Sequence, residues 1–258
     1  MGLLDNESIP RRKMTLFFVI DTSGSMVGSK IGSVNDAIEN VLPMIGEISD
    51  ENPDAEINVA ALEFSTGTHW LYDEPKEAKE FIWQKVEADG LTSLGEACEE
   101  LNKKLSRNGG FMSSPSGCFA PANIQLSDGG PTDNFEGGLR SLQGNSWYKN
   151  AIKIAIAIGD DAEKAVLAEF TGTIESVITV NDKHTLKALI RKVSVRASEF
   201  QSHSKQSGDT TSSAEDDSDK IAQDAVTEIK QDASQNSPVS GGDSGAIDVS
   251  LDQDWGNW

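Results

Sequence analysis

The chain has 258 residues and a formal net charge of −20 at pH 7, with 42 acidic residues against 22 basic ones. This balance argues against nucleic acid or an anionic membrane surface as a partner, because both require a basic face on the protein. No apolar run is long enough to cross a membrane, and two cysteines do not make a disulfide framework. The length suits one large domain, or one domain with a tail.

Apolar runs and helical patterns alternate along the chain. The first run, Thr15–Ile20, contains five consecutive apolar residues, as is typical of a central parallel strand that is covered on both faces. A helix is predicted next over Lys30–Ile48, where the apolar residues recur on one face. The other predicted strands are Ile57–Phe64, His69–Tyr72, Ala122–Ser127, Ile152–Ile158 and Ser176–Val180. The other predicted helices are Ser93–Leu105, Asp161–Phe170 and Lys183–Phe200.

Three stretches between these elements are less regular. Ser65–Thr68 fits a hairpin turn, and Arg107–Pro121 is rich in Gly, Ser and Pro, as loops are. Lys76–Ala88 is expected to be partly helical and to bury four residues against the sheet: Phe81, Ile82, Trp83 and Val86. The alternation of strands and helices predicts an α/β fold, with a doubly wound, mostly parallel central sheet and helices on both faces.

The composition predicts three regions, namely an N-terminal extension over residues 1–13, a folded domain over 14–202 and an acidic tail over 203–258. The extension lacks the apolar core of a secretory signal, so we expect a cytoplasmic protein. The tail holds twelve acidic residues against three basic ones, a net charge of −9, and few aliphatic residues. We therefore expect it to be largely disordered on its own, with a transient helix over Asp219–Gln231.

The end of the tail carries two tryptophans among acidic residues, Trp255 and Trp258. Tryptophans are common anchors in the pockets of protein partners, which makes these two tentative partner-binding residues. The alternative is that they belong to a disordered tail without a partner.

The most informative polar residues follow the first predicted strand. Asp21, Ser23 and Ser25 supply one carboxylate and two hydroxyls at alternate positions, which point the same way along an extended loop. An all-oxygen set of this kind suits a hard cation such as Mg²⁺ and is poor for zinc or copper. The alternative is a helix N-cap and turn, because Ser and Asp favour such positions without any metal.

The segment Asp21-Thr22-Ser23-Gly24-Ser25 resembles the D-x-S-x-S motif of the von Willebrand factor A domain, where it forms a metal-ion-dependent adhesion site, or MIDAS. That family adds a threonine and an aspartate from two later loops, and this chain has Thr92 and Asp128 in the matching order and context. The phrases TSLGEA and LSDGGPTD are similar to the bacterial, tellurium-resistance-associated TerY branch. The resemblance covers about residues 15–202.

The resemblance implies a metal-dependent module for protein–protein interaction that performs no chemistry. Its metal would be Mg²⁺, with Mn²⁺ or Ca²⁺ as alternatives, held by Asp21, Ser23, Ser25, Thr92 and Asp128. A protein partner would complete the metal's shell with a carboxylate. The TerY-like branch further implies a scaffold or regulator in a bacterial stress-response system, working with a Ser/Thr kinase and a phosphatase.

Two alternatives remain open at this level. The same carboxylates could serve a metal-assisted hydrolase, although the ligand loops offer no general base or nucleophile beyond the ligands themselves. An acidic side chain of the tail could also occupy the metal site, either in the same molecule or in a second copy.

Overall fold

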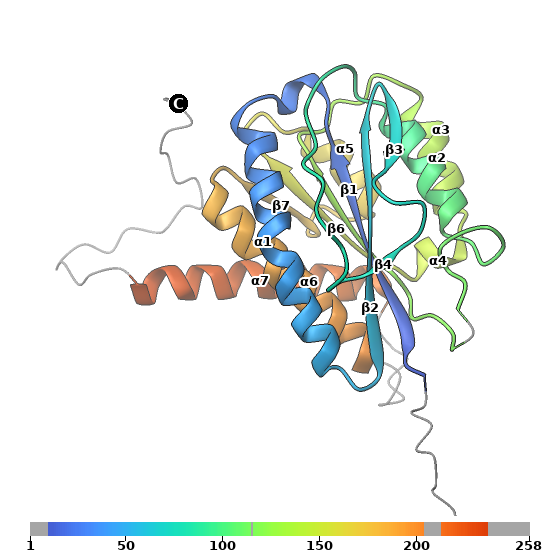
Figure 1. Ribbon diagram of the computed structural model, residues 1–258. Helices are drawn as coiled ribbons and strands as arrows, with labels where there is room; N and C mark the ends of the chain where they lie inside the picture. The colour runs from blue at the N-terminus through green and yellow to red at the C-terminus, as the bar shows by residue number, and fades with distance from the viewer. Residues whose placement is uncertain (1–9, 115, 204–212, 237–258) are drawn as a thin grey trace, which may run out of the picture.

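The computed structural model describes residues 10–114, 116–203 and 213–236, and these form an α/β fold around one seven-stranded sheet (Figure 1). The strand order is β3-β2-β1-β5-β6-β7, with β4 also paired to β2. The strands are β1 (Arg12–Asp21), β2 (Ala55–Ser65), β3 (Gly67–Trp70), β4 (Lys76–Glu77), β5 (Ala122–Ser127), β6 (Ile152–Ile158) and β7 (Val177–Val180). Only β3 and β4 run antiparallel to their neighbour among these strands, which confirms the predicted mostly parallel sheet.

Helices cover both faces of the sheet, because the central strands are apolar on both sides. The helices are α1 (Ser29–Glu51), α2 (Leu94–Lys104), α3 (Phe135–Gln143), α4 (Ser146–Lys149), α5 (Lys164–Thr171), α6 (Lys183–His203) and α7 (Ala214–Asn236). In β1, Leu16 and Phe18 face the core shared with α1 and α6, whereas Phe17 and Val19 face the core shared with α2 and α3. Successive residues of a strand point to opposite faces, and this explains the division.

The order in which the chain adds strands reverses at β1, because β2 pairs with one edge of β1 and β5 pairs with the other. The chain leaves β1 towards α1 on one face and leaves β5 towards α3 on the opposite face. The carboxyl ends of these two strands therefore open a crevice between diverging loops, the usual place for a ligand in an open α/β sheet. This crevice is where the sequence places its candidate metal ligands.

Helices α3 and α4 lie in a stretch for which the sequence predicts no element. Helix α3 contains Gly137 and Gly138, which weaken the helical tendency of a nine-residue segment. The structure needs Gly138 because a Cβ atom there would collide with the backbone carbonyl of Gly95 in α2. Close packing of α2 on α3 stabilises a helix that its local sequence does not.

The stretch predicted to be partly helical, Lys76–Ala88, is a short strand followed by an irregular strap. Phe81, Trp83 and Val86 are buried as predicted, but the prediction for Ile82 is wrong, because its side chain is 73% exposed. The strap is fixed by buried Asn35 of α1, which donates to the Val86 carbonyl at 2.9 Å and accepts from the Val86 amide at 2.9 Å. Asn35 also accepts from Trp83 Nε1 at 3.0 Å. These long-range bonds replace the helical bonds that the local pattern suggested.

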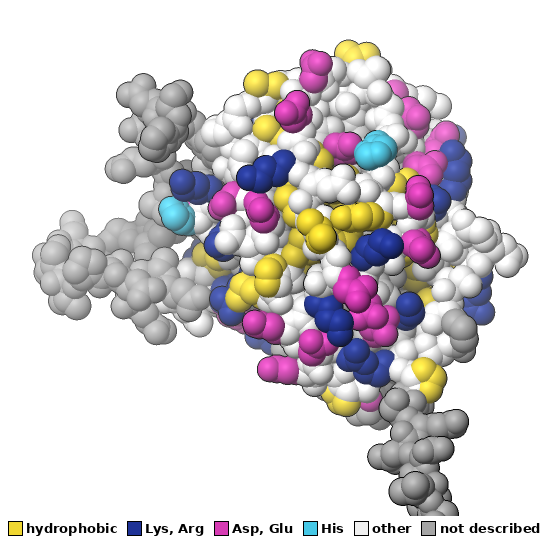
Figure 2. Space-filling model, viewed as in Figure 1, with side chains coloured by type: hydrophobic (Ala, Val, Ile, Leu, Met, Phe, Trp, Pro, Cys, Tyr) yellow, Lys and Arg dark blue, Asp and Glu magenta, His cyan; other side chains and the backbone are white. Residues whose placement is uncertain are grey.

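The surface in Figure 2 carries interspersed basic and acidic side chains, together with a band of apolar ones across its middle. On this face the coloured side chains form no continuous basic area. Within the described ranges, no helix combines the length and the apolar character that crossing a bilayer requires.

Part of the tail that we expected to be disordered on its own is the helix α7, which packs on the domain. Its residues Ile221, Ala222 and Ala225 belong to the core shared with α1 and α6. Asp219 of α7 accepts a hydrogen bond from Ser176 at 2.6 Å, and Ser218 accepts one from the Lys153 amide at 3.0 Å. Burial of a sparse apolar stripe and these polar contacts explain the ordered helix. The domain boundary at residue 202 stays a prediction, because residues 204–212 lie outside the described part.

We expect replacement of Asn35 by alanine to lower the free energy of unfolding by about 2–3 kcal/mol, because it leaves buried polar groups of the strap unpaired. Asn40→Ala is the matched control on the same helix, since Asn40 is exposed and its side-chain amide donates to Asp36 one turn earlier. Urea denaturation of both variants measures the difference. Equal stability of the two would contradict the role given to Asn35.

We expect Ile221→Ala to lower the free energy of unfolding by about 2–4 kcal/mol, as for other buried aliphatic residues. Exposed Gln223 on the same helix provides the control, and Gln223→Ala should change stability by less than about 0.5 kcal/mol. Thermal or urea unfolding of the full chain tests this. A neutral Ile221→Ala variant would show that α7 does not pack on the domain in solution.

Candidate metal centre

Four of the five predicted ligand residues meet at the carboxyl edge of β1 and β5. Asp21 is the last residue of β1, and Ser23 and Ser25 lie in the turn that follows, with Gly24–Met26 forming a 3₁₀ turn. Asp128 comes directly after Ser127, the last residue of β5. Because β1 and β5 are parallel and paired, their carboxyl ends lie side by side.

An unbroken set of hydrogen bonds joins these side chains. Ser23 Oγ and Ser25 Oγ are 3.0 Å apart, and Ser25 Oγ donates to Asp128 Oδ1 at 2.9 Å. The Ser23 amide donates to Asp21 Oδ1 at 2.9 Å, and Ser127 Oγ donates to Asp21 Oδ2 at 2.6 Å. The bonds hold two carboxylates and two hydroxyls in one compact group.

The fifth predicted ligand, Thr92, is buried on a loop that is bonded to the turn after β1. Gly24 N donates to the Gly90 carbonyl at 3.0 Å, and Asp89 N donates to the Thr22 carbonyl at 2.9 Å. The Thr132 amide, in the loop that follows Asp128, donates to the Thr92 carbonyl at 2.9 Å, and the Thr92 amide donates to Thr132 Oγ1 at 3.0 Å. Within the described ranges no hydrogen bond joins the Thr92 hydroxyl to the other four residues. The structure therefore places its loop at the site, and its role as a ligand stays a prediction.

The two carboxylates of the site are buried, and burial disfavours their charged forms. Burial raises the pKa of Asp21 to about 6, although hydrogen bonds from Ser127 and Ser23 oppose this, and the charge of Asp128 raises it further. Asp21 is fully buried and Asp128 is 6% exposed. Two negative charges in such surroundings favour a bound cation.

The residues present fit a hard divalent ion. Carboxylate and hydroxyl oxygens are the donors that such ions prefer, and the group contains no sulfur or imidazole. Among the described residues, no cluster of three or more His, Cys, Asp or Glu side chains could hold a metal ion. A metal at this edge would therefore depend on Ser23 and Ser25 as much as on the two aspartates.

Sequence reasoning missed three residues of this site. Ser127 bonds Asp21, and the ammonium of Lys30 donates to Asp128 Oδ2 at 3.0 Å and to both carboxylate oxygens of Asp161 at 2.9 and 3.0 Å. Burial disfavours the charged lysine, but the hydrogen bonds with Asp161 and Asp128 outweigh this and raise the pKa of Lys30. Asp161 lies three residues after the end of β6, and the tendency of ligand residues to follow strand ends could have found it.

Asp133, which lies five residues after Asp128 in the same loop, has a structural role. Its two carboxylate oxygens accept from the Gly95 amide at 2.9 Å and the Glu96 amide at 2.8 Å in the first turn of α2. It therefore caps α2 from the loop that carries Asp128 and holds these two segments together. Trp255 and Trp258, the tentative partner-binding residues, lie outside the described residues.

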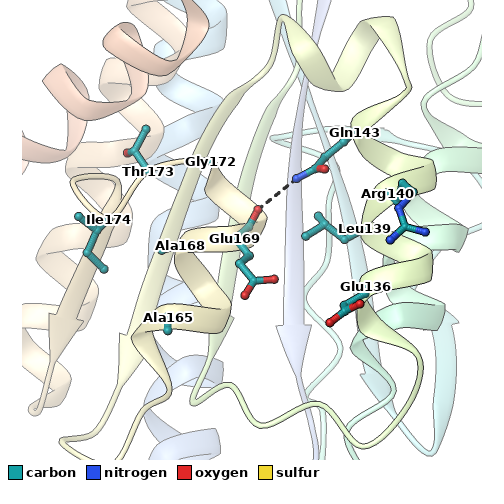
Figure 3. Close-up of a pocket in the computed structure, with 10 residues that line it drawn as sticks. All are labelled: Glu136, Leu139, Arg140, Gln143, Ala165, Ala168, Glu169, Gly172, Thr173 and Ile174. Carbon is teal, nitrogen blue, oxygen red and sulfur yellow. Dashed lines mark hydrogen bonds between the residues drawn. The ribbon is translucent and has the colours of Figure 1, made fainter.

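The described part of the chain also has cavities outside the candidate metal centre. A groove of about 540 Å³ runs between α3 and α5, with Leu139 and Arg140 on one side and Ala165 and Ala168 on the other (Figure 3). None of the five predicted ligands lines it. A polar hollow of about 360 Å³ adjoins the site, since Thr22 lines it together with residues of β2 and β3.

No protein-family model and no curated protein matches this chain, but solved structures do. They include a von Willebrand factor type A protein from Catenulispora acidiphila, with a TM-score of 0.52 and 18% identity over 72% of this chain and 43% of that one. The ArnB paralog VWA2 from Sulfolobus acidocaldarius gives a TM-score of 0.51 and 20% identity, over 70% of this chain and 45% of that one.

A third neighbour is proximal thread matrix protein 1 from the mussel byssus, in a form with zinc in its MIDAS motif. Its TM-score is 0.53 and its identity 16%, over 73% of this chain and 48% of that one. This chain thus spans less than half the length of these three structures. At such identities the likeness concerns the fold, and this chain has the fold of von Willebrand factor A domains.

Proposed function

We propose that this chain is a divalent-cation-dependent module for protein–protein interaction. The observation that carries the proposal is the bonded set Asp21–Ser23–Ser25–Asp128 at the crevice between β1 and β5. These groups are two carboxylates and two hydroxyls, and they converge from two separate loops. A purely structural N-cap or turn does not require a second buried carboxylate from another strand.

The ion that we propose for this site is Mg²⁺, with Mn²⁺ or Ca²⁺ as alternatives, held by Asp21, Ser23, Ser25, Thr92 and Asp128. Zinc in the byssus protein supports the capacity of this fold for a divalent metal, and the all-oxygen donor set here favours a harder ion. Mg²⁺ keeps exchangeable waters and can accept a carboxylate in place of one of them. The partner would therefore offer an aspartate or glutamate.

Two exposed apolar side chains flank the proposed site and supply contact area for such a partner. Val27 is 61% exposed and Leu91 is 57% exposed. Val27 N donates to the Gly24 carbonyl at 3.3 Å, and Gly24 N donates to the Gly90 carbonyl, next to Leu91. Both side chains thus belong to the bonded loops around the ligands. An acidic residue beside apolar ones is the partner surface that fits this edge.

The alternative function is a metal-assisted hydrolase, and we propose that the chain is not an enzyme. A hydrolase needs a general base or a nucleophile beside the metal. Lys30 is paired with two carboxylates, and Ser127 Oγ donates to Asp21 while accepting from the Gly129 amide at 2.8 Å. Both groups are therefore committed to structural bonds. Turnover of phosphate esters or peptides that depends on Asp21 would overturn this choice.

A more specific role follows from the sequence phrases alone. TSLGEA and LSDGGPTD support a TerY-like scaffold or regulator in a cytoplasmic stress response, with a kinase and a phosphatase as partners. That assignment stays a prediction, as do the tail tryptophans as anchors.

We expect Mg²⁺ to stabilise the chain against heat, by about 2.7 kcal/mol at a concentration one hundred times its dissociation constant. Asp21→Asn should abolish this response, because it removes one of the two carboxylates from the site. Asp89→Asn is the control, since Asp89 is exposed on a neighbouring loop and its carboxylate accepts from the adjacent Gly90 amide. Differential scanning calorimetry with Mg²⁺ or EDTA measures the effect. An equal Mg²⁺ response in Asp21→Asn would place the metal elsewhere.

We expect peptides selected from a random display library in Mg²⁺, after removal of those that bind in EDTA, to share an acidic residue. Changing that acid to its amide should weaken binding at least tenfold, or about 1.4 kcal/mol, because the amide cannot neutralise the cation. Binding should also be lost in the Asp21→Asn protein and kept in Asp89→Asn. Selected peptides without acids, or binding that survives the change to the amide, would contradict the proposed recognition.

A further inference from the structure

Lys30 places a positive charge directly beside the proposed metal site. Its ammonium donates to Asp128 Oδ2 at 3.0 Å and to Asp161 Oδ1 and Oδ2 at 2.9 and 3.0 Å. The side chain of Lys30 is 16% exposed, that of Asp128 is 6% exposed and that of Asp161 is 71% exposed. The ion pair with Asp128 is thus shielded from water, whereas the outer partner Asp161 is not.

The stability of α1 does not explain a lysine at this position. Lys30 is the second residue of α1, where the positive end of the helix dipole disfavours a cation. The first turn of α1 contains no acidic residue that would offset this. A lysine here destabilises the start of the helix, and its favourable interactions are those with the carboxylates of Asp128 and Asp161.

The surroundings of the ammonium are closely fitted. Gly159, which directly follows β6, has a φ of 93°, and a Cβ atom there would lie 2.6 Å from Asp161 Oδ1 and 3.0 Å from Lys30 Cε. The positive φ at this position favours glycine, and the missing side chain of Gly159 leaves room for the ion pair between Lys30 and Asp161. Lys30 is held in place from β6 as well as from the metal loops.

Both oxygens of Asp128 are occupied in this arrangement. Oδ1 accepts from Ser25 Oγ, and Oδ2 accepts from Lys30. An ammonium bonded to one of the two site carboxylates cancels part of the negative charge that attracts a divalent ion. It also repels that ion across a short, poorly screened distance.

We propose that Lys30 is an internal counter-ion that lowers the metal affinity of the empty module, so that firm metal retention depends on the partner's carboxylate. This inference rests on the proposed function. The partner's acid restores the negative charge that Lys30 cancels, and metal and partner then strengthen each other's binding, as linkage requires. Asp161 is a positioning residue in this scheme, because it shares the ammonium with Asp128 and so limits its effect on the site.

The test uses the full chain and titrates Mn²⁺ alone, followed by electron paramagnetic resonance of the free ion. Lys30→Gln should bind Mn²⁺ roughly tenfold tighter than the wild type, the effect expected of one nearby charge. Asp161→Asn should bind it several-fold weaker, because Lys30 then bonds Asp128 alone. The double variant should match Lys30→Gln, since exposed Asp161 acts only through Lys30.

Two controls separate this scheme from general charge effects and from damage to the fold. Lys164→Gln removes an exposed lysine one residue from Glu163, whose amide donates to the Asp128 carbonyl at 2.7 Å, and it should leave the affinity unchanged. Circular dichroism and urea unfolding establish that each variant is folded.

The outcomes are distinguishable. An affinity of Lys30→Gln equal to or below that of the wild type overturns the role of Lys30 while leaving the metal module intact. The positioning role of Asp161 is overturned if adding Asp161→Asn to Lys30→Gln weakens Mn²⁺ binding as much as Asp161→Asn weakens it in the wild type. Absence of Mn²⁺ binding in both the wild type and Lys30→Gln overturns this inference together with the proposed function. Acetate stands in for the partner's carboxylate. If acetate increases the Mn²⁺ affinity more in the wild type than in Lys30→Gln, the link to the partner's carboxylate is supported.

Discussion

Two buried carboxylates leave adjacent parallel strands at the same edge of the sheet, and the architecture of this edge depends on how their charge is compensated. Asp21 ends β1 and Asp128 follows β5, and the two strands are paired up to Ile20 and Leu126. Isolated charges in such a position are costly, since water is excluded and like charges repel. Hydroxyls, backbone amides and the Lys30 ammonium surround them, and each supplies a positive or partly positive group.

Hydroxyl side chains suit this edge because each can both donate and accept. A serine Oγ has one proton and two lone pairs, so Ser25 donates to Asp128 and still has lone pairs available for a cation. An aspartate in place of Ser23 or Ser25 would add a third buried negative charge. The residue types therefore allow the same loops to be stable without a metal and to serve as ligands with one.

The features predictable from sequence are those that depend on contiguous residues. The apolar runs of β1, β5 and β6 define buried strands, and the polar residues that end them define the edge where Asp21 and Asp128 meet. The strap and α3 escaped prediction because distant groups stabilise them. Asn35 holds the strap from α1, and Gly138 allows α3 to pack on α2.

Long-range contact also explains why the sequence predicts only a transient helix in the region of α7 and does not single out Lys30. A short apolar stripe cannot stabilise α7 alone, but Ile221, Ala222 and Ala225 enter a core already formed by α1 and α6. In the sequence Lys30 is an ordinary helix residue, and only the fold brings Asp128, after β5, and Asp161, after β6, next to it. In both cases the local sequence gives the element or the charge, and only the tertiary structure gives its partner.

The overall charge of the chain gives the proposed metal a further role. With a net charge of −20, the protein repels an acidic partner at long range and attracts divalent cations to its surface. An acidic residue of a partner can approach this edge only if the local potential is reversed over a few ångströms. Salt screens the long-range repulsion far more than it screens a contact inside a buried site. Lys30 alone cannot reverse the potential, because its charge is already shared between Asp128 and Asp161. A divalent ion can reverse the potential, so the proposed recognition of an acidic partner would require the metal and the partner to bind together.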